Sequence, residues 1–494
     1  MKLNLIIICC VLLCCCGQSF DYVVINGSSE YEAEIAFLES LFNNEEITSL
    51  GFRLLPSDGA DSNQNKLQPS IYIDFFSSWE QEISSGEIVI SRQFIIPRDD
   101  ALARRTNTTL EACLNGSETL IKINELEPPF VALRVDGLTI GDIDYPLIRA
   151  AGIRIRINYG KETDKTIAKR FSQLEEALKN AQKPLVQQIP QPIWIAAGGD
   201  MMLERGASEI LFREGPTGIF GGTAKLLASS DISMVNLEGA ISALGERVRK
   251  TFTFRFVPET AQALKNAGIN VVLFANNHSF DYGEEAFLDS LSWLNKVGIG
   301  IVGAGVDIES ASDPFIFEKD GDTVRVFGLA SFPREQNGWD GVTAAAGEGR
   351  PGMLHVGRRG AEMLKQKFSP DSLNIVFFHG GVEWSIRPDA ATRELYTDLI
   401  ISGADLIIGT HPHVVQGFEW VHGKPVFWSI GNYVFGGMNH LEGGADGLFL
   451  HLGFWRGKLL YMEPYPIFLN NIRTDIVSRD RLDLFYSRSR ELRR

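Results

Sequence analysis

From residue 193 onward, short apolar runs rich in Val, Ile and Phe alternate with helix-length segments such as 284–296. Strands that are covered on both faces read as continuous apolar runs, so this alternation predicts an α/β fold with buried strands. The last part differs, because 447–468 holds two apolar runs around an Arg456-Gly457 pair that favours a tight hairpin turn. The pattern therefore predicts a mixed sheet rather than a purely parallel one.

The residues before this region predict a separate, smaller α/β domain over 16–182. Helical periodicity covers 30–42 and 165–181, and strand-like apolar runs lie at 71–76, 88–96, 130–135 and 153–157. A linker over 183–192 follows, because three prolines and three glutamines there disfavour helix and strand hydrogen bonding. A second domain over 193–470 and a C-terminal tail over 471–494 complete the expected organisation.

The first residues are typical of an export signal. A lysine precedes a largely apolar run over 3–13, which is too short to span a bilayer as a helix and leads into Cys14-Cys15-Cys16. This arrangement resembles a bacterial lipoprotein signal. The resemblance implies removal of 1–15 and acylation of Cys16, and hence a chain exported to the bacterial cell envelope and anchored to a membrane by lipid. Modification of Cys14 or Cys15, and an ordinary secretory peptide, are the alternatives.

Charge narrows the classes of partner. The 62 acidic residues outnumber the 47 basic ones and give a formal net charge of −15, so the field of the chain repels phosphate backbones. Nucleic acid is therefore not an expected partner. The last residues run against this balance, with arginines at 488, 490, 493 and 494. A solvated tail and a membrane-surface patch are both compatible with them.

Five of the apolar runs end in polar residues that can bind a metal ion. The side chains at these ends are Asp200, Glu238, Asn277 with His278, His379, and His411 with His413. Each alone is compatible with a helix cap or a core histidine. The carboxyl ends of strands in open α/β sheets line one ligand crevice, so the five ends are expected to converge. Carboxylate, amide and imidazole groups in one place are what a metal-assisted hydrolase requires.

Two local spacings sharpen this prediction. In His411-Pro412-His413, the proline favours an extended conformation for the residue before it, and residues two apart on an extended chain project the same way. Both imidazoles are thus expected to reach one metal cluster. In Asn277-His278, neighbouring side chains point differently, which lets the amide oxygen face a metal while the imidazole faces the substrate as a proton donor.

Several motifs in order along 193–470 resemble those of the CapA family. They are Gly199-Asp200, Asn236-Leu-Glu-Gly239, the run 275–283, His379 with Glu383, the run 408–413 and the run 429–435. Proteins of that family are associated with capsule and poly-γ-glutamate synthesis and belong to the calcineurin-like metallophosphoesterase superfamily. The resemblance implies a four-layer αββα sandwich with metal ions at one sheet edge.

The resemblance also implies roles for individual residues. Asp200 and His413 are ligands of a first metal, Glu238 bridges the two metals, and the second metal is held by Asn277, His379 and His411. His278 protonates the leaving group, a water of lowered pKa between the metals is the nucleophile, and Arg255 clamps an anionic substrate group. A surface position of Arg255 on a strand is the alternative. With nitrogen and oxygen ligands, the expected cofactor is one or two divalent ions of manganese, iron or zinc.

Two positions depart from the family pattern. The superfamily usually places a histidine two residues after the first aspartate, whereas this chain has Met202, so one metal instead of two is an alternative. The family often has tryptophan directly after the histidine that aligns with His379, whereas this chain has Gly380 and carries Trp384 further on. The shape of the pocket near these residues is therefore not predicted by the resemblance.

Two functions follow as hypotheses. The first is an envelope-anchored hydrolase that attacks a phosphoester, or an amide bond of an anionic polymer such as poly-γ-glutamate, since metal-activated water attacks either centre. The second is a non-catalytic polymer-binding or export component that keeps the metallophosphoesterase fold. In both, the anionic polymer or phosphoester, the membrane and inner-membrane polymer synthesis proteins are the expected partners.

Overall fold

The computed structural model describes residues 191–492 apart from 336–337. From the N-terminal part it describes 7–9, 22–27, 70–79, 82, 87–101, 105–142, 144–158, 165, 169, 172–174 and 176–177. The predicted lipidation site Cys16, the helix expected over 30–42 and linker residues 183–190 lie outside the described residues. Among the described helices, none has the length and apolar character needed to cross a membrane.

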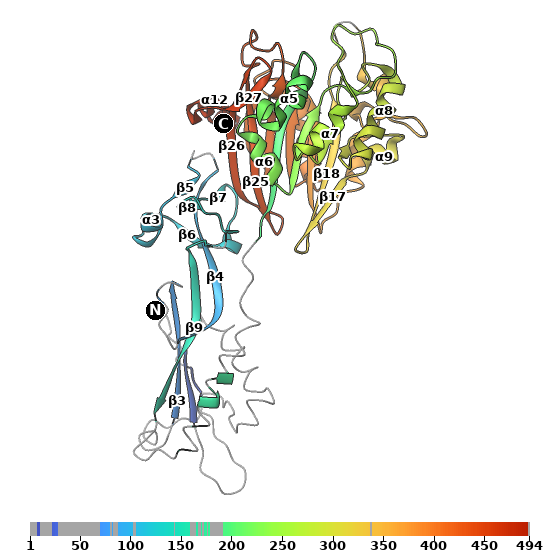
Figure 1. The fold of residues 1–494 in the computed structure, drawn as a ribbon. Helices are drawn as coiled ribbons and strands as arrows, with labels where there is room; N and C mark the ends of the chain where they lie inside the picture. Colours follow the sequence, from blue (N-terminus) through green and yellow to red (C-terminus); the bar gives the residue numbers. More distant parts are fainter. Residues whose placement is uncertain are drawn as a thin grey trace. The chain divides into compact units, whose positions relative to one another are not determined.

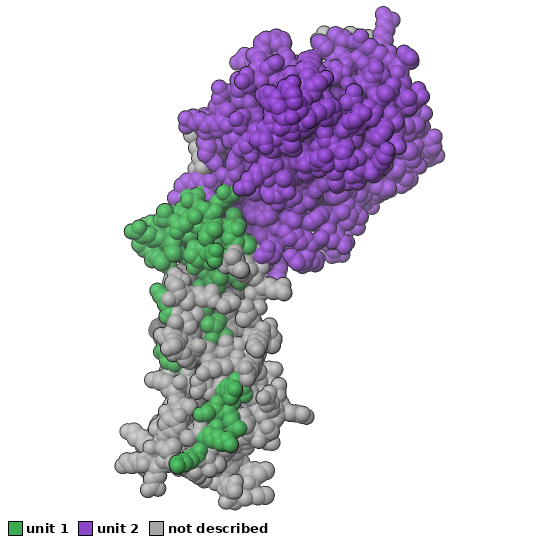
Figure 2. All heavy atoms as spheres, viewed as in Figure 1, with its two compact units in different colours: residues 1–97, 107–125, 134–190 green, residues 98–106, 126–133, 191–494 purple. Residues whose placement is uncertain are grey.

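The chain divides into two compact units (Figure 2). Unit 1 comprises residues 1–97, 107–125 and 134–190, and unit 2 comprises residues 98–106, 126–133 and 191–494. Two short segments of the N-terminal region therefore belong with the C-terminal unit. One of them includes strand β7 (Phe130–Ala132), which contacts strand β26 (Lys458–Asn470) within unit 2.

Unit 1 is built on one long-stranded sheet. Its strands run in the order β1 (Ile7–Cys9), β2 (Tyr22–Gly27), β3 (Ser70–Trp79), β9 (Ile148–Asn158), β4 (Glu87–Asp100) and β6 (Leu120–Lys122). The last three residues of β4, 98–100, belong to unit 2 and pair there with β7. The apolar runs 71–76, 88–96 and 153–157 lie in these strands, as predicted. A short helix, α3 (Leu110–Leu114), begins where the Thr109 hydroxyl accepts a hydrogen bond from the Ala112 amide.

The first sheet of unit 2 combines parallel and antiparallel strands (Figure 1). Its order is β15 (Gly300–Val302), β14 (Val271–Leu273), β11 (Ile232–Leu237), β10 (Ile193–Met202), β25 (Asp446–Trp455), β26 and β27 (Arg473–Ile476), and β24 (Asn432–Phe435) also pairs with β10. The strands β15, β14, β11 and β10 are parallel, whereas β25 runs antiparallel to β10. The prediction of a mixed sheet is confirmed.

The second sheet of unit 2 has parallel strands at its centre and antiparallel strands at its edges. Its order is β17 (Phe315–Lys319), β18 (Asp322–Ser331), β20 (Leu373–Gly380), β21 (Leu406–Thr410), β23 (Lys424–Ile430) and β22 (Val415–Val421). The four central strands are parallel, so their carboxyl ends meet at one edge of the sheet.

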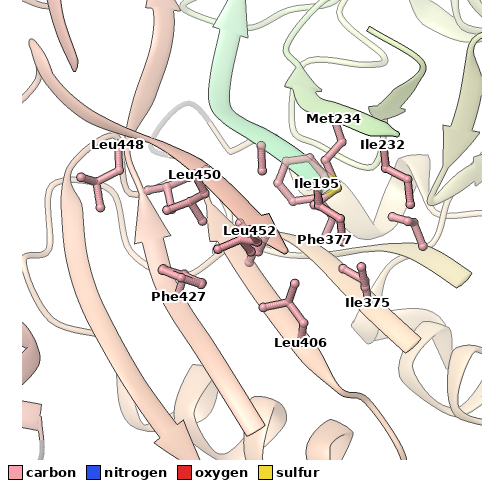
Figure 3. Packing of buried hydrophobic residues seen from close by; sticks show 14 of the residues in the cluster. Ile195, Ile232, Met234, Ile375, Phe377, Leu406, Phe427, Leu448, Leu450 and Leu452 are labelled. Carbon is pink, nitrogen blue, oxygen red and sulfur yellow. The ribbon is translucent and has the colours of Figure 1, made fainter. Parts of the chain in front are cut away.

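Alternate residues of these strands pack into different hydrophobic clusters. Ile195 and Met234 of the first sheet pack into one buried cluster with Phe377 and Leu406 of the second sheet (Figure 3). The intervening residues face helices instead. Those of the first sheet pack with α5 (Ala207–Phe220), α6 (Thr223–Ser229), α7 (Glu259–Asn266) and α8 (Gly283–Lys296), and those of the second with α9 (Ile308–Ser312), α10 (Gly360–Lys365) and α11 (Ala390–Ile401).

This period-two alternation follows from strand geometry, in which successive side chains point to opposite faces. It explains why the central strands read as unbroken apolar runs, because both of their faces are covered. A fully buried side chain such as Phe377 contributes about 1.5–3 kcal/mol to stability relative to an exposed one. The α/β class predicted for this region is confirmed.

The predicted hairpin also forms. Strands β25 and β26 pair antiparallel from Asp446↔Phe468 to Trp455↔Lys458, and the turn between them is Arg456-Gly457. Both turn residues have positive φ, 49° and 73°. Tight two-residue hairpins favour such turns because their backbone twist matches that of the flanking strands.

The C-terminal residues form more structure than the expected tail over 471–494. Residues 473–476 form β27, which pairs with β26, and Leu482–Leu492 form helix α12. Leu482, Phe485 and Tyr486 of this helix are buried in the core between the sheets. The Ser489 hydroxyl accepts a hydrogen bond of 2.9 Å from the Phe418 amide in β22. An amphipathic helix with this buried face accounts for the difference, since its apolar residues need a packing partner.

Candidate metal centre

The five strand ends singled out in the sequence meet in unit 2. Asp200 lies near the end of β10, Glu238 directly follows β11, and Asn277 and His278 lie a few residues after β14. His379 lies near the end of β20, and His411 and His413 follow β21. The first three strands belong to one sheet and the last two to the other. The structure therefore brings residues from the carboxyl ends of both sheets into one cluster.

Asp200, Glu238 and His379 form the buried centre of this cluster. Their ligand atoms lie within 4.8 Å of one another, and all three side chains are inaccessible to solvent. The Nδ1 atom of His379 lies 3.6 Å from Asp200 Oδ1 and 3.7 Å from Glu238 Oε1. This group of two carboxylates and one imidazole is suited to hold a divalent cation.

The remaining predicted ligands surround this centre. The Nε2 atom of His379 lies 3.0 Å from Asn277 Oδ1 and 3.0 Å from His411 Nδ1. On the other side, His413 Nδ1 lies 3.2 Å from Asp200 Oδ2. Asn277, His411 and His413 are all buried, with exposed fractions of 3–5%. The structure thus brings together all six predicted metal ligands.

A close approach of two strands places Asp200. The Asp200 amide donates a hydrogen bond of 3.1 Å to the Gly431 carbonyl, which precedes β24. A Cβ atom at Gly199 would lie 1.9 Å from that carbonyl oxygen, so only glycine permits the approach. The register of β10 against β11 also shifts between Ala197 and Asp200, which turns the carboxylate toward the cluster.

Asn236 orients the two carboxylates, a role that the sequence prediction missed. Its Nδ2 atom donates hydrogen bonds to Asp200 Oδ1 at 2.8 Å and Glu238 Oε1 at 3.0 Å, and lies 3.0 Å from His379 Nδ1. Asn276 donates to Asn236 Oδ1 in turn, at 3.0 Å. The available signal was a polar residue in an apolar strand two positions before Glu238, because residues two apart share a face.

The route by which His411 and His413 converge differs from the predicted one. His411 has a φ of 93° and His413 a φ of 58°, so the segment is not extended. Positive φ is uncommon for residues with a side chain and is found where surrounding structure enforces it, often at functional sites. The His411 amide donates a hydrogen bond of 3.1 Å to Asp200 Oδ2, and this contact helps to hold the turn. The two rings lie with their centroids 6.2 Å apart.

His278, the predicted proton donor, is held by a carboxylate. Its Nδ1 atom lies 2.6 Å from Asp281 Oδ2. The same oxygen accepts a hydrogen bond of 2.7 Å from the Phe254 amide, and the Phe254 ring lies 4.3 Å from the His278 ring. These contacts fix the orientation of the imidazole. Because Nδ1 is paired with Asp281, Nε2 is the ring nitrogen that remains for other interactions.

A buried lysine completes this arrangement. The side chain of Lys250 is fully inaccessible, and its Nζ atom lies 2.9 Å from Asp281 Oδ1 and 2.9 Å from Glu335 Oε1. Nζ also donates to the Asn277 carbonyl and lies 4.2 Å above the Trp339 ring. The sequence contains no spacing signal for Lys250, which lies between β12 (Ala240–Ile241) and β13 (Arg255–Phe256) and reaches the site only in the folded chain.

Burial and neighbouring charges shift the protonation of the two carboxylates in opposite directions. Burial, followed by the nearby charge of Asp200, raises the pKa of Glu238 well above its usual range. For Asp200, burial acts in the same direction, but hydrogen bonds from His379 and His413 outweigh it and hold the pKa well below its usual range. Imidazoles thus compensate the negative charge of Asp200, whereas the charge of Glu238 lacks such compensation.

Burial also keeps the central imidazoles neutral. It lowers the pKa of His379 to about 4, and burial together with His379 lowers the pKa of His411 well below its usual range. Burial lowers the pKa of His278 as well. At His413, burial is outweighed by the Asp200 hydrogen bond and charge, so the pKa is raised. A neutral imidazole has the lone pair that metal coordination needs.

One atom shows that the cluster fits a cation. Oε2 of Glu238 is buried and has no hydrogen-bond partner among the described residues. An unpaired carboxylate oxygen in a water-excluded site is costly unless a cation compensates it. The surrounding nitrogen and oxygen atoms suit manganese, iron or zinc. The residues present therefore fit a divalent metal ion, whose identity the donor set leaves open.

Trp384 lies beside the cluster, whereas Arg255 contacts Tyr282 and Glu204. The Arg255 guanidinium lies 4.1 Å from the centre of the Tyr282 ring, and its amide donates to Glu204 Oε1 at 2.6 Å. Trp384 lies with its ring 5.5 Å from that of His413, and its amide donates to the Pro412 carbonyl at 2.9 Å. Trp384 thus takes a place beside the metal ligands although Gly380 follows His379 in the chain. The indole was not included among the predicted site residues.

The chain is similar to proteins with names that refer to capsule and polyglutamate synthesis. The family model described as "Bacterial capsule synthesis protein PGA_cap" matches residues 194–437. "PGA biosynthesis protein CapA" of Bacillus subtilis is 28% identical over 241 residues, which cover 48% of this chain and 62% of that protein. "Capsule biosynthesis protein CapA" of Bacillus anthracis is 28% identical over 250 residues, covering 48% of this chain and 58% of that protein.

Further matches extend this set. A "Probable polyglutamine synthesis accessory protein" of Mycobacterium tuberculosis is 27% identical over 288 residues, covering 50% of this chain and 75% of that protein. A solved structure of a hypothetical protein from Thermus thermophilus matches 55% of this chain and 98% of that chain, with 14% identity and a TM-score of 0.34. The match to each of the two Bacillus proteins spans less than two thirds of its length. The resemblance found in the motifs is confirmed, and the region 194–437 belongs to the CapA family of bacterial capsule synthesis proteins.

Proposed function

We propose that unit 2 is a metal-dependent hydrolase that acts in capsule or poly-γ-glutamate synthesis at the bacterial envelope. In this proposal it is a four-layer αββα sandwich of the metallophosphoesterase type. The two sheets with a shared core, each with helices on its other face, support this fold. The names of the CapA relatives support the setting, and the buried cluster supports the chemistry.

The unpartnered Oε2 atom of Glu238 is the observation that carries the proposal. His413 lies beside Asp200, Asn277 and His411 lie beside His379, and Glu238 lies within 4.8 Å of both Asp200 and His379. These six residues would hold the metal. When bound, a divalent cation supplies Lewis-acid polarisation of a phosphoryl or carbonyl oxygen and activation of water.

The chain's own residues supply positioning and proton transfer. Asp281 binds His278 at Nδ1, so Nε2 is left to hold the proton for the leaving group. Lys250 fixes Asp281 from its other oxygen, which keeps the imidazole in one orientation. Arg255, which follows Phe254 in the chain, would bind an anionic part of the substrate. Burial of the cluster excludes bulk water and strengthens these interactions.

A non-catalytic role in polymer handling is the second candidate. The names of the relatives describe biosynthesis, and one describes an accessory protein, rather than a hydrolase. Purified chain loaded with manganese or zinc, assayed on an aryl phosphate and on poly-γ-glutamate, separates the two functions. Turnover of either substrate supports the hydrolase. A chain that binds metal and poly-γ-glutamate but hydrolyses neither substrate supports the second candidate.

His278→Ala is expected to lower kcat by about 10²–10⁴-fold while the metal content per chain stays unchanged, because His278 acts on a proton and not on the metal. Steady-state kinetics combined with elemental analysis measure both quantities. His440→Ala, at an exposed histidine outside the cluster, is the matched control and should retain full activity. Equal activity of His278→Ala and the control would remove His278 from the proposed mechanism.

The envelope anchor depends on Cys16 in this proposal. A Cys16→Ser variant is expected to lose incorporation of labelled fatty acid and to move from the membrane fraction to the soluble envelope fraction. Cys14→Ser and Cys15→Ser are the matched controls, and both should keep the label. Label that persists in Cys16→Ser but disappears in one of the controls would identify that other cysteine as the acylated residue.

A further inference from the structure

A hollow in unit 2 is lined by residues other than the predicted metal ligands. It has a volume of about 210 Å³ and combines residues from four parts of the fold. Its lining consists of Ile386 and Arg387 from the segment after β20, Arg393 from α11, Gln416 from β22, and Arg488, Glu491 and Leu492 from α12. The lining thus contains three arginines and one glutamate, in a chain with a net charge of −15. We call this hollow the arginine pocket.

Two of the arginines are at its solvent side. Arg387 pairs with Glu491 at 2.6 Å, and 69% of the Arg387 side chain is exposed. Arg393 pairs with Glu419 at 3.1 Å and is 40% exposed. Both side chains of the Arg387–Glu491 pair are exposed, and such a pair contributes about 0–1 kcal/mol to stability, so Arg387 can readily exchange Glu491 for another anion. Each guanidinium keeps further N–H donors for a ligand.

Arg488 is at the inner side and is less well satisfied. One of its terminal nitrogens donates to the Val415 carbonyl, whereas its Nε atom is buried without a hydrogen-bond partner. Among the residues that the structure describes, no carboxylate forms an ion pair with it. A buried N–H of a charged group without an acceptor is costly, and a ligand anion would remove that cost.

The arginine pocket is linked to the metal ligands through a short segment. The Ser385 carbonyl accepts a hydrogen bond of 2.9 Å from Gln416, a pocket residue, and the Ser385 hydroxyl donates to the Arg387 carbonyl at 2.6 Å. The preceding residue is Trp384, the ring of which lies 5.5 Å from the His413 ring. Arg387 follows Trp384 by only a few residues, so their Cα atoms lie at most about 11 Å apart.

We propose that the arginine pocket is a subsite for carboxylate groups of an acidic polymer, of which a neighbouring segment lies at the metal centre. A chain with a carboxylate on every repeat offers several anions at regular spacing, and planar guanidinium groups bind carboxylates in a bidentate manner. Binding at two places along one molecule raises the overall affinity without further contacts. The inference rests on the proposed function, since it names the class of substrate for that site.

Binding of a fluorescent γ-linked glutamate oligomer to the full chain tests this subsite. Fluorescence anisotropy is measured for the unaltered chain, for Arg387→Gln and for Arg488→Gln. Arg490→Gln is the matched control, because it removes the same charge from an exposed position of α12 outside the pocket. We expect about tenfold weaker binding for each pocket variant and unchanged binding for the control. Circular dichroism shows whether α12 still folds in Arg488→Gln. If that variant unfolds, Arg387→Gln still tests the subsite, because Arg387 is exposed and its substitution is not expected to affect folding.

Each other outcome has a defined meaning. Equal affinity of Arg387→Gln, folded Arg488→Gln and Arg490→Gln for the oligomer would overturn the subsite. Polyphosphate that binds the unaltered chain in a manner dependent on Arg387, while the glutamate oligomer does not, would overturn the assignment to carboxylates. Hydrolysis of an aryl phosphate by the unaltered chain tests the proposed function separately. A chain without turnover that loses oligomer binding in the pocket variants would keep the subsite and reject the hydrolase.

Discussion

Glu238→Gln is expected to reduce bound metal to background and to lower hydrolase activity by at least about 10³-fold. The substitution keeps the size of the side chain but removes the negative charge that the buried Oε2 atom presents to the cluster. It also removes a carboxylate that lies within 4.8 Å of the ligand atoms of both Asp200 and His379. Elemental analysis and kinetics of the purified variant measure the two effects.

The same variant is expected to change the sign of its stability effect when metal is removed. Metal at 1,000 times the Kd should stabilise the unaltered chain by about 4 kcal/mol relative to its metal-free state. This gain exceeds the effect of the substitution on the metal-free protein, so the metal-loaded unaltered chain should be more stable than the variant by about 1–3 kcal/mol. After chelation, Glu238→Gln should be the more stable protein by about 1–3 kcal/mol, because an uncompensated buried carboxylate has been removed. Denaturation of both proteins with and without chelator measures the reversal.

The pH dependence of the metal-free protein follows from the same residue. Burial and the Asp200 charge raise the pKa of Glu238 in the folded state, so the unfolded chain releases this proton first as the pH rises. The contribution of Glu238 to the stability of the folded protein is therefore complete below its usual pKa of 4.5. This contribution is lost as the pH rises toward the raised pKa of the folded state. The advantage of Glu238→Gln over the unaltered chain should increase over that range.

Glu463→Gln is the matched control for these measurements. Glu463 is also a buried glutamate, but it lies outside the cluster and pairs with Arg479 at 3.0 Å. Its substitution should destabilise the protein to the same extent with and without metal. If Glu238→Gln behaved in the same way and kept its metal, Glu238 would not be a ligand.

Lys250→Met is expected to destabilise unit 2 by about 3–5 kcal/mol. The fully buried Lys250 lies 2.9 Å from both Asp281 and Glu335, and methionine would leave these carboxylates without their cation. Because Asp281 holds His278, kcat should fall even under conditions in which the variant is folded. Urea denaturation gives the loss of stability, and kinetics at low temperature give the effect on kcat.

Lys365→Met controls for the loss of a lysine as such. Lys365 pairs with Asp398 at 2.8 Å, but the Asp398 side chain is 55% exposed. Water replaces the partner of an exposed carboxylate, so the expected change is about 0–1 kcal/mol. A Lys250→Met variant as stable as this control would show that Asp281 and Glu335 do not depend on Lys250.

The strand pattern was sufficient to predict much of the candidate site. Five apolar runs that become strands end in, or are closely followed by, residues that can bind metal, and parallel strands place their carboxyl ends at one edge. The pattern can be recognised within each short segment, and the geometry of the sheet predicts that the ends of these segments meet. The grouping of Asp200, Glu238 and His379 was therefore predictable from the sequence. The hairpin at Arg456-Gly457 was predictable for a similar reason, since its turn is determined by two adjacent residues.

Contacts between distant segments were not predictable in this way. The turn at His411 has positive φ, and the hydrogen bond from its amide to Asp200 that helps to hold it joins residues from two different sheets. Lys250 and Glu335 meet around Asp281 although no spacing in the sequence relates them. Helix α12, expected as a tail, packs on the core because its apolar residues find a surface that exists only in the folded unit.

Periodicity and residue type in this chain by themselves determine the α/β class of unit 2, the mixed sheet and the identity of the polar residues at the strand ends. These depend on side-chain alternation and local backbone preferences, which act over a few residues. The tertiary structure alone decides the orientation of Asp200 and Glu238 by Asn236, the fixing of His278 by Lys250 through Asp281, and the meeting of three arginines in one pocket. Each of these depends on distances between residues that are far apart in sequence, and packing of the two sheets and α12 sets those distances.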